Sequence, residues 1–225
     1  MEKRAISNRT LKRLPLYLGY LKGMPEGEVN VSATSIAERL GLNEVQVRKD
    51  LALASSGGRP KVGYVRRALI EDLEKFLRYD ALDRAVLVGT GYLGHALLCY
   101  QGFARRGLEI VAGFDADPAH HGREICGKPV LKMDQLADTC ERMQVRIGII
   151  TVPDYAAQQV CDQLVEAGVL AIWNFAPIRL NAPERVLVQN EGIESSLAVL
   201  STRLAERLEA EVVAKTDRAA EEGNA

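Results

Sequence analysis

Apolar positions at helical spacing predict a small helical domain over residues 1–80. Leu11, Leu14, Leu18 and Leu21 recur every three or four residues, which is typical of an amphipathic helix. Further helices are predicted at residues 36–40, from 44 to about 54, and at 66–80, where Leu69, Leu73, Phe76 and Leu77 face inward.

The helices at 36–40 and 44–54 are predicted to form a helix-turn-helix. Gly41 follows the first as a terminating glycine, and Asn43 is a good cap for the second. Small Ala37 allows the helices to approach, and branched Val47 holds the second against the first. Recognition helices contact DNA from the outer face near their N-terminal half. A plain helical hairpin in a small bundle is the alternative.

A glycine-rich segment at residues 55–65 predicts a turn that enters a β-hairpin. A hairpin after a helix-turn-helix is the wing of a winged helix domain. Basic side chains at its tip would reach backbone phosphates or a narrow minor groove. The candidate DNA-binding residues are Asn43, Gln46, Arg48, Lys49, Arg59, Lys61 and Tyr64.

Charge is distributed unevenly along the chain. The formal charge is +5 over residues 1–80 and −6 over the remainder, although the whole chain carries only −1. Residues 46–67 hold six basic side chains and a single acidic one, Asp50. Phosphate neutralisation requires such a local excess of positive charge, although a solvated face with scattered cations has the same composition.

From residue 81 onward, short apolar strands alternate with helices, which predicts an α/β domain with a doubly wound parallel sheet of the Rossmann type over residues 81–192. The first strand, 85–88, enters a G-x-G-x-x-G loop at 89–94, and a helix is predicted from His95 to about Arg105. The other strands are predicted at 109–114, 145–152, 169–173 and 185–188, with a helix at 154–167.

This glycine loop has the context of a dinucleotide site. Gly89 makes the turn, Gly91 lets the backbone approach a pyrophosphate, and Gly94 lets the helix pack on the strand. Asp115 follows Gly94 by 21 residues, where an acid that binds the ribose is expected. A carboxylate there repels a 2′-phosphate, so NAD(H) is predicted over NADP(H). A glycine-rich loop without a ligand is the alternative.

Two further segments are predicted at the carboxyl ends of strands, where ligands bind in such sheets. Thr151–Pro153 and Asn174–Pro177 are both expected to face the nicotinamide half of the cofactor. The candidate cofactor-binding residues from these segments and the loop are Gly89, Thr90, Gly91, Tyr92, Leu93, Gly94, Asp115, Thr151, Val152, Pro153, Asn174 and Phe175.

The last part of the chain predicts an interface helix over residues 193–214. A leucine stripe at 197, 200, 204 and 208 needs a partner surface, and a second subunit is the natural one. Packing on its own domain is the alternative. Residues 215–225 are expected to form a charged, frayed tail.

Four widely spaced cysteines form no C-x-x-C pair, which argues against a zinc site and a disulfide scaffold. Four free thiols fit a reducing cytoplasm. The sequence contains neither a signal-peptide pattern nor an apolar run long enough to span a membrane.

An NAD-dependent oxidoreductase is the enzymatic alternative. It would need an acid or base for hydride transfer, and none of the three histidines has that placement. No sizeable substrate domain remains beyond the two assigned domains. A regulator that binds another nucleotide, or coenzyme A, is a further alternative. Asp115 argues mildly against a 3′-phosphorylated ligand, because it favours a free ribose diol.

Taken together, both domains resemble the Rex family of redox-sensing repressors over nearly the whole chain. The segments that carry the resemblance are Lys12–Tyr17, Val47–Leu51, Val62–Tyr64, the glycine loop, Phe114–Pro118, Thr151–Pro153 and Asn174–Pro177. The resemblance implies a homodimer that binds pseudo-palindromic operators and represses genes of fermentation and respiration. It implies release from DNA when NADH rises.

The chain departs from the family at positions that couple the cofactor to domain closure. Family members use an arginine on the first helix, a tyrosine after the glycine loop and an aspartate near the final helix. Here the tyrosine matches Tyr100, which joins the cofactor-binding candidates. The arginine position falls on Gly19, and the aspartate position falls on or near Gly192, where Glu191 is a loose substitute. A weak NADH response, or a different nucleotide effector, is therefore an alternative.

Overall fold

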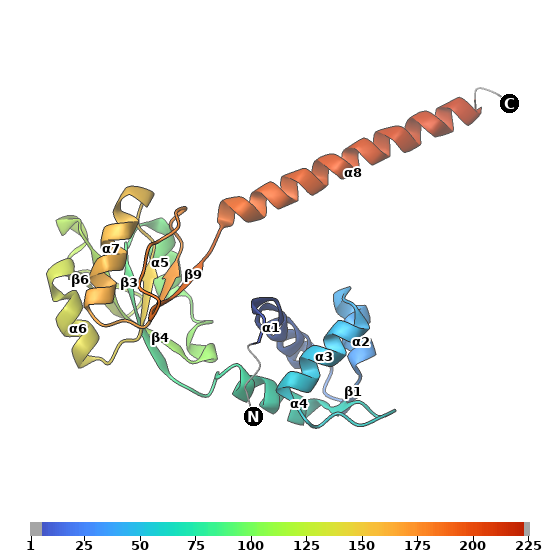
Figure 1. Ribbon diagram of the computed structural model, residues 1–225, viewed down its shortest axis with the longest axis horizontal. Coiled ribbons are helices and arrows are strands. Elements are labelled where there is room, and N and C mark those ends of the chain that lie inside the picture. The colour runs from blue at the N-terminus through green and yellow to red at the C-terminus, as the bar shows by residue number, and fades with distance from the viewer. Residues whose placement is uncertain (1–5, 223–225) are drawn as a thin grey trace. The chain divides into compact units, whose positions relative to one another are not determined.

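The computed structural model describes residues 6–222, with the side chains of all of these except 193 and 212–222. The chain forms two units, and many of their helices and strands are labelled in Figure 1. The first runs to Leu82 and includes Gly102–Gly107, and the second includes Asp83–Gln101 and the chain from Leu108 onward. Residues 102–107, which the sequence analysis assigned to the Rossmann domain, thus group with the first unit.

The first unit packs four helices around one apolar core. Leu14, Ile36, Val47 and Leu73 are fully buried there, whereas Leu11, predicted on the same stripe, is exposed. The elements are α1 (Asn8–Gly23), β1 (Asn30–Val31), α2 (Ala33–Leu40), α3 (Glu44–Ala54), β2 (Tyr64–Val65), α4 (Arg66–Phe76) and the short 3-10 helix η1 (Ala104–Arg106).

The predicted helix-turn-helix is confirmed in α2 and α3. Gly41 takes the left-handed conformation, with φ of 64°, and its N–H donates to the carbonyl of Ala37. Asn43 caps α3, because its side-chain oxygen accepts a hydrogen bond of 3.1 Å from the backbone N–H of Gln46. The turn and the start of α3 are therefore fixed by local interactions.

The wing is present, but its strand partner differs from the prediction. Arg59 and Gly63 exchange backbone hydrogen bonds of 2.8 and 2.9 Å, which closes the tip. Strand β2 then pairs antiparallel with β1, which lies before α2. Strand β1 was not predicted, because a strand of two residues has no period to detect.

A buried carboxylate joins α3 to α1. Arg13 donates to Asp50 through Nε at 2.7 Å and Nη2 at 3.0 Å, and the Tyr17 hydroxyl donates at 2.8 Å. Gln46 Nε2 also donates to this carboxylate, at 2.9 Å. Burial alone would raise the pKa of Asp50, but these hydrogen bonds outweigh it and lower the pKa. Burial, followed by the bond to Asp50, raises the pKa of Tyr17 to about 12.

The second unit is the predicted Rossmann domain. Its strand order is β5-β6-β4-β3-β7-β8-β9, with every pair parallel except β5 and β6. Strands β5 and β6 and helix α6 were not predicted from the sequence. The elements are β3 (Asp83–Val88), α5 (Tyr92–Cys99), β4 (Leu108–Asp115), η2 (Pro118–His120), β5 (Glu124–Ile125), β6 (Lys128–Lys132), η3 (Met133–Gln135), α6 (Leu136–Arg142), β7 (Ile147–Ile150), α7 (Asp154–Glu166), β8 (Ala171–Asn174), β9 (Leu187–Asn190) and α8 (Ile193–Glu222).

Alternate residues of β4 face opposite layers of helices. Ala112 and Phe114 belong to the core cluster that includes α6 and α7. Gly113 lies between them, and a Cβ there would come within 3.2 Å of the side chain of Leu98 on α5. The sheet is therefore covered by α5 on one face and by α6 and α7 on the other.

Helix α5 is shorter than predicted. It ends at Cys99 rather than near Arg105, and Cys99 forms a disulfide with Cys126 at the turn between β5 and β6. The expectation of four free thiols is thus wrong, since only Cys140 and Cys161 are free. Spacing along the sequence does not reveal which cysteines meet in the fold.

Helix α8 is longer than predicted. It extends to Glu222 and so includes most of the segment assigned to a frayed tail. Its described side chains from residue 194 to 211 are exposed, with Leu197, Leu200, Leu204 and Leu208 each more than half exposed. Among the described residues, no helix is long and apolar enough to cross a membrane.

We predict that Asp50→Asn destabilises the first unit at pH 7. Because it leaves Arg13 without its charged partner, the loss should be about 2 kcal/mol in the free energy of unfolding, discounted from the value for a fully buried pair because Arg13 is partly exposed. Urea titration with hydrogen exchange at α3 would measure it.

The pH dependence gives a second check on Asp50. Its pKa is lower in the folded state, so its stabilisation is fully present above the unfolded pKa of about 3.9 and is lost as pH falls through the folded value. The Asp50→Asn variant should not show this loss of stability at low pH.

Glu71→Gln is the control. It removes an exposed partner of Arg67 and should change stability by less than about 0.5 kcal/mol. Equal stability of Asp50→Asn and wild type would contradict the prediction.

Candidate functional site

The loop after β3 is held by backbone contacts that only glycine permits. A Cβ on Gly94 would lie 1.9 Å from the carbonyl oxygen of Gly89, so α5 packs directly against the loop. Gly89 has a φ of 97°, and a Cβ there would lie 2.7 Å from the carbonyl oxygen of Thr151. A Cβ on Gly91 would meet no protein atom within 4 Å. The space in front of the N-terminus of α5 is therefore open, and a ligand can approach the protein backbone there.

Asp115 connects the ends of β3 and β4. Its Oδ2 accepts hydrogen bonds of 2.7 Å from both the backbone N–H and the hydroxyl of Thr90. His120 Nδ1 lies 3.0 Å from the same oxygen, and Asp117 N–H donates to Oδ1 at 3.0 Å. Among the described residues Oδ1 accepts this one hydrogen bond, so it retains capacity for a ligand hydroxyl.

These donors keep Asp115 ionised. Burial would raise the pKa of this carboxyl, but the hydrogen bonds from Thr90, Asp117 and His120 together lower it to about 2. At neutral pH the group is therefore an acceptor with a full negative charge. Such a group fits a ribose diol and repels a phosphate at the same position.

A cavity of about 770 Å³ lies at the carboxyl ends of β3, β4 and β7. Its volume is in the range of small-molecule sites. The predicted residues that line it are Gly89, Gly91, Asp115, Thr151, Val152 and Pro153. The structure thus brings together residues that are more than 60 positions apart in the chain.

Other predicted cofactor residues lie outside this lining. Thr90 is buried behind Asp115, and Gly94 packs on Gly89. Tyr92 is 100% exposed, and Leu93 is exposed on the same helix. Tyr100, just past the end of α5, is also exposed. Their direct contact with a cofactor stays a prediction.

The side chain of Asn174 has a structural role in the loop after β8. It is fully buried, and its Nδ2 donates to the carbonyls of Ala176 and Ile178 at 3.2 and 2.9 Å and to Asn190 Oδ1 at 2.9 Å. Its Oδ1 accepts a hydrogen bond from Ala176 N–H at 3.0 Å. The side chain therefore holds the loop after β8 and does not line the cavity. Phe175 is half-buried, with its ring centroid 5.0 Å from that of Trp173.

Polar residues that the sequence analysis did not select also line the cavity. His120 and His121 come from the segment after β4, Lys132 from the end of β6, and Gln159 from α7. The positions of Lys132 and the two histidines depend on β6 and on the loop after Asp115, neither of which has a period in the sequence, whereas Gln159 lies on a helix that was predicted. The one available signal was that both histidines follow Asp115 closely.

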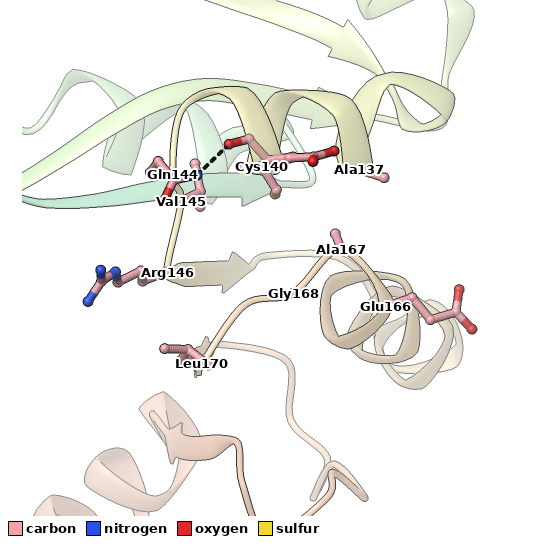
Figure 2. Close-up of a pocket in the computed structure, with 10 residues that line it drawn as sticks. Ala137, Cys140, Gln144, Val145, Arg146, Glu166, Ala167, Gly168 and Leu170 are labelled. Atoms are coloured by element: carbon pink, nitrogen blue, oxygen red, sulfur yellow. Dashed lines mark hydrogen bonds between the residues drawn. The ribbon is translucent and has the colours of Figure 1, made fainter.

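A second hollow of about 540 Å³ lies at the opposite end of the sheet (Figure 2). Arg146 directly precedes β7, and Leu170 directly precedes β8. Val145 N–H donates to the carbonyl of Cys140 at 2.9 Å on one wall. Ligands of open parallel sheets bind outside the carboxyl ends of the strands, so this hollow is not the candidate site.

Three of the four predicted basic residues of the first unit line one surface hollow. Arg48 of α3 and Arg59 and Lys61 of the wing line the same hollow of about 600 Å³, beside Ser32 at the start of α2. Arg48 forms an ion pair with Glu44 one turn earlier. Because α3 and the wing contribute to one basic surface, the arrangement fits a nucleic-acid backbone.

The other predicted DNA-binding residues differ in availability. Lys49 is exposed, as are Asn43 and Gln46, although Asn43 caps α3 and the Gln46 amide is bound to Asp50. Tyr64 lines the hollow but is only 8% exposed, and a Cβ on Gly58 would touch its ring. Burial raises the pKa of Tyr64, so its hydroxyl stays neutral.

The positions expected to couple the units carry no side chain. Gly19 is exposed on α1, and a Cβ there would meet nothing within 4 Å. Gly192 is exposed just before α8. The nearby carboxylate of Glu191 accepts a hydrogen bond of 3.0 Å from Trp173 Nε1. Glu191 is therefore already engaged within its own unit.

Family models match both units. A model described as "CoA binding domain" matches residues 80–178, and one described as "Putative DNA-binding protein N-terminus" matches residues 5–52. The first matches the segment with the glycine loop, and the second matches the segment with the helix-turn-helix.

Relatives match across the chain. A protein of Bacteroides thetaiotaomicron named redox-sensing transcriptional repressor Rex is 42% identical over 196 residues, which is 87% of this chain and 89% of the relative. The protein of the same name from Streptomyces coelicolor is 41% identical over 199 residues, covering 88% of this chain and 77% of the relative.

Solved structures match as well. RSP in complex with β-NAD⁺ and operator DNA has a TM-score of 0.85 and 32% identity, covering 94% of this chain and 98% of RSP. RSP with β-NADH has a TM-score of 0.83 at the same identity, covering 94% of this chain and 100% of RSP. Another structure describes RSP as a Rex-family repressor.

Two of the three glycines in the loop, Gly94 and Gly91, should respond differently to alanine. Gly94→Ala places a Cβ 1.9 Å from a backbone oxygen and should cost about 1–3 kcal/mol of stability. Gly91→Ala meets no protein atom and should stay within about 1 kcal/mol of wild type, a range that allows for its position as the helix cap. Differential scanning calorimetry would compare the stability of the two variants. Equal losses of stability would contradict the close packing of Gly94 against Gly89.

Proposed function

Because the chain belongs to the family of redox-sensing transcriptional repressors called Rex, we propose that it occupies pseudo-palindromic operators while NADH is scarce and leaves them when NADH binds. Members of this family are regulators rather than enzymes. The observation that carries the proposal is that one chain joins a basic winged helix-turn-helix to a glycine loop with an ionised carboxylate at the ribose position.

Double-stranded DNA is the ligand proposed for the first unit. Arg48, Lys49, Arg59 and Lys61 are all exposed and come from α3 and the wing. In winged helix-turn-helix domains the second helix enters the major groove. The wing cations then lie where the adjacent backbone or minor groove passes.

NAD(H) is the ligand proposed for the second unit. The open space at Gly91 would admit the pyrophosphate at the N-terminus of α5. Asp115 would accept hydrogen bonds from the adenosine ribose through Oδ1. Thr151, Val152 and Pro153 would lie toward the nicotinamide half. When bound, the cofactor supplies a redox state to be sensed.

Coenzyme A is the competing ligand, since one matching family model carries that description. Its adenosine ribose is phosphorylated at the 3′ position. The carboxylate of Asp115, with a pKa of about 2, would repel that phosphate. The site therefore favours a dinucleotide with free ribose hydroxyls.

A homodimer is the assembly that fits both a pseudo-palindromic operator and α8. Four leucines on one stripe of α8 are between 53% and 64% exposed in the single chain. A second copy of this helix would bury them, and two-fold symmetry would place two recognition helices on two half-sites. Operator binding also implies a cytoplasmic location for the protein.

The coupling between the two ligands is proposed to be weaker than the resemblance alone implies. Gly19 and Gly192 cannot form the ion pair or hydrogen bonds that an arginine and an aspartate would form. Glu191 is occupied by Trp173. We therefore expect reduced discrimination between NADH and NAD⁺.

Arg48→Ala should weaken operator binding, with a loss of about 1–3 kcal/mol for a base contact, or a salt slope reduced by about 1 for a phosphate contact. Fluorescence anisotropy at several salt concentrations, on an operator selected from a random duplex pool, would measure it. Arg142→Ala is the matched control, because Arg142 also pairs with an acid one turn away but lies in the other unit. Unchanged affinity of Arg48→Ala would move the DNA surface elsewhere.

Asp115→Asn should weaken NADH binding about tenfold or more, because a charge-assisted hydrogen bond is lost. Calorimetric titration with NADH, NAD⁺ and coenzyme A would measure it, and operator binding of the cofactor-free variant should be unchanged. Tighter binding of coenzyme A than of NADH would contradict the ligand assignment. A large NADH preference, with efficient NADH-driven release from DNA, would contradict the weakened coupling.

A further inference from the structure

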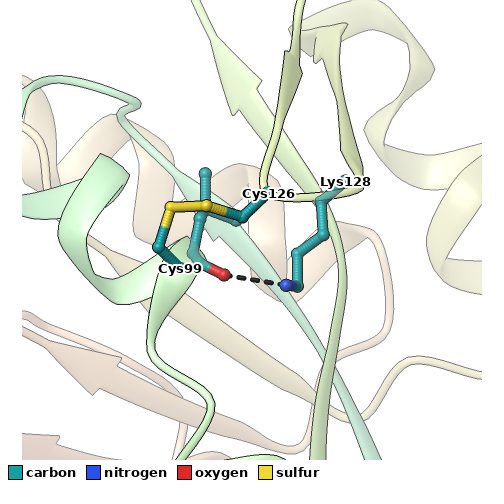
Figure 3. The surroundings of a disulfide bond; sticks show 4 residues. Cys99, Cys126 and Lys128 are labelled. Carbon is teal, nitrogen blue, oxygen red and sulfur yellow. Dashed lines mark hydrogen bonds between the residues drawn. A yellow bond between two sulfur atoms is a disulfide. The ribbon is translucent and has the colours of Figure 1, made fainter.

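The disulfide between Cys99 and Cys126 has no part in the function proposed so far. It joins the last residue of α5 to the exposed turn between β5 and β6, with the two Cα atoms 5.2 Å apart (Figure 3). Helix α5 is the helix whose N-terminus faces the cofactor cavity. The bond therefore connects the cofactor loop, through one short helix, to the edge of the sheet.

A disulfide in a protein that is proposed to act in the cytoplasm needs an explanation. Small thiols keep the cysteines of cytoplasmic proteins reduced, and disulfides that form there are usually transient and redox-sensing. A bond whose role is only structural would be unexpected in that compartment.

The other two cysteines differ from this pair in burial and therefore in reactivity. Cys140 and Cys161 are buried, and burial raises the pKa of Cys140 to about 11. Cys126 is exposed and Cys99 is half-buried. Oxidation and reduction by small molecules would therefore be confined to the pair at 99 and 126.

The surroundings of the pair also favour exchange. Cys126 and Gly127 both have positive φ, in the turn that presents the sulfur to solvent. The Lys128 ammonium donates to the carbonyl of Leu98 at 2.7 Å, so a positive charge lies at the end of α5 beside Cys99 (Figure 3). It opposes the negative end of the helix dipole, which would otherwise disfavour a thiolate at Cys99.

The position of Cys99 in the chain gives the bond a consequence. Tyr100 follows directly, and the chain leaves the second unit after Gln101 to contribute Gly102–Gly107 to the DNA-binding unit. Fixing Cys99 thus fixes the end of α5 immediately before the chain passes between the units.

We propose that Cys99 and Cys126 form a reversible thiol–disulfide site that reacts with low-molecular-weight thiols and their disulfides, and that the oxidised pair holds the end of α5 in the arrangement that binds the cofactor. The site gives the protein a second redox input beside the dinucleotide. This consequence for the cofactor and the argument from a reducing cytoplasm rest on the proposed function, whereas the exposure of the cysteine pair to small thiols does not.

The exchange balances with a small thiol as the reductant. A thiolate attacks the exposed Sγ of Cys126, forming a mixed disulfide and releasing Cys99 as a thiolate. A second small thiolate attacks the external sulfur of the mixed disulfide and releases Cys126. Two protons from the medium complete the two protein thiols, and the small molecule leaves as its symmetrical disulfide. Oxidation is the reverse.

The full-length protein would be equilibrated with mixtures of reduced and oxidised glutathione, alkylated and analysed by mass spectrometry. We expect the pair to convert from dithiol to disulfide within the series while Cys140 and Cys161 stay reduced and unalkylated in the native state. A pair that remains fully reduced, or fully oxidised, across the series would overturn the proposal. Cys161→Ala is the control that should leave the titration unchanged.

Hydrogen exchange and calorimetry would then compare the two forms. Reduction should speed exchange at the end of α5 and at the β5–β6 turn, and should weaken NADH binding about threefold or more because a less ordered site costs more to organise. The double variant Cys99→Ser/Cys126→Ser should match the reduced protein and ignore glutathione. Equal exchange in both forms, or equal NADH affinity, would refute the coupling. Absence of NADH binding in both forms would instead refute the proposed function. The glutathione titration and hydrogen exchange would still test the thiol–disulfide site, because neither needs a cofactor.

Discussion

The close approach of α5 to the loop after β3 is the constraint on which the second unit depends. It requires Gly94 to carry no side chain, because its Cβ would lie 1.9 Å from the carbonyl oxygen of Gly89. The same approach places Thr90 between the ends of β3 and β4, where it donates twice to Asp115. The acceptor offered to a ligand is therefore positioned by backbone packing rather than by a flexible side chain. Preorganisation of this kind lowers the entropic cost of binding.

The first unit solves a similar problem with a buried charge. Asp50 lies on the inner side of α3 and is held by Arg13 and Tyr17 of α1. This fixes the rotation of α3, so its outer side presents Arg48 and Lys49. The amide of Gln46 is bound to Asp50 and is less available to a base edge. The contacts of this carboxylate with α1 set the orientation of α3. They also contribute to stability, because removing one partner would leave the other charge uncompensated.

Features determined by neighbouring residues could be predicted from the sequence. The left-handed Gly41 and the Asn43 cap are confirmed, since each follows from local backbone geometry. Strand β1 could not be found, because its two residues acquire meaning only when paired with β2. The Cys99–Cys126 bond was missed for the same reason, as its partners meet only through the sheet. In the candidate site, the loop and Asp115 were predictable, whereas Lys132 and Asn174 depend on strand ends and loop contacts that the sequence does not reveal.

The two units are joined by a chain that crosses between them three times, after Leu82, after Gln101 and after Gly107. Without side chains at Gly19 and Gly192, a charged pair at those positions is absent, so signals between the units must use other connections. The second and third crossings enclose the segment 102–107, which begins just after α5 and Tyr100. Under the two proposals above, a change in α5 caused by the cofactor at its N-terminus or by the disulfide at its C-terminus would reach this segment directly along the chain. Of the three crossings, the one after Gln101 is therefore the one nearest to both proposed redox inputs.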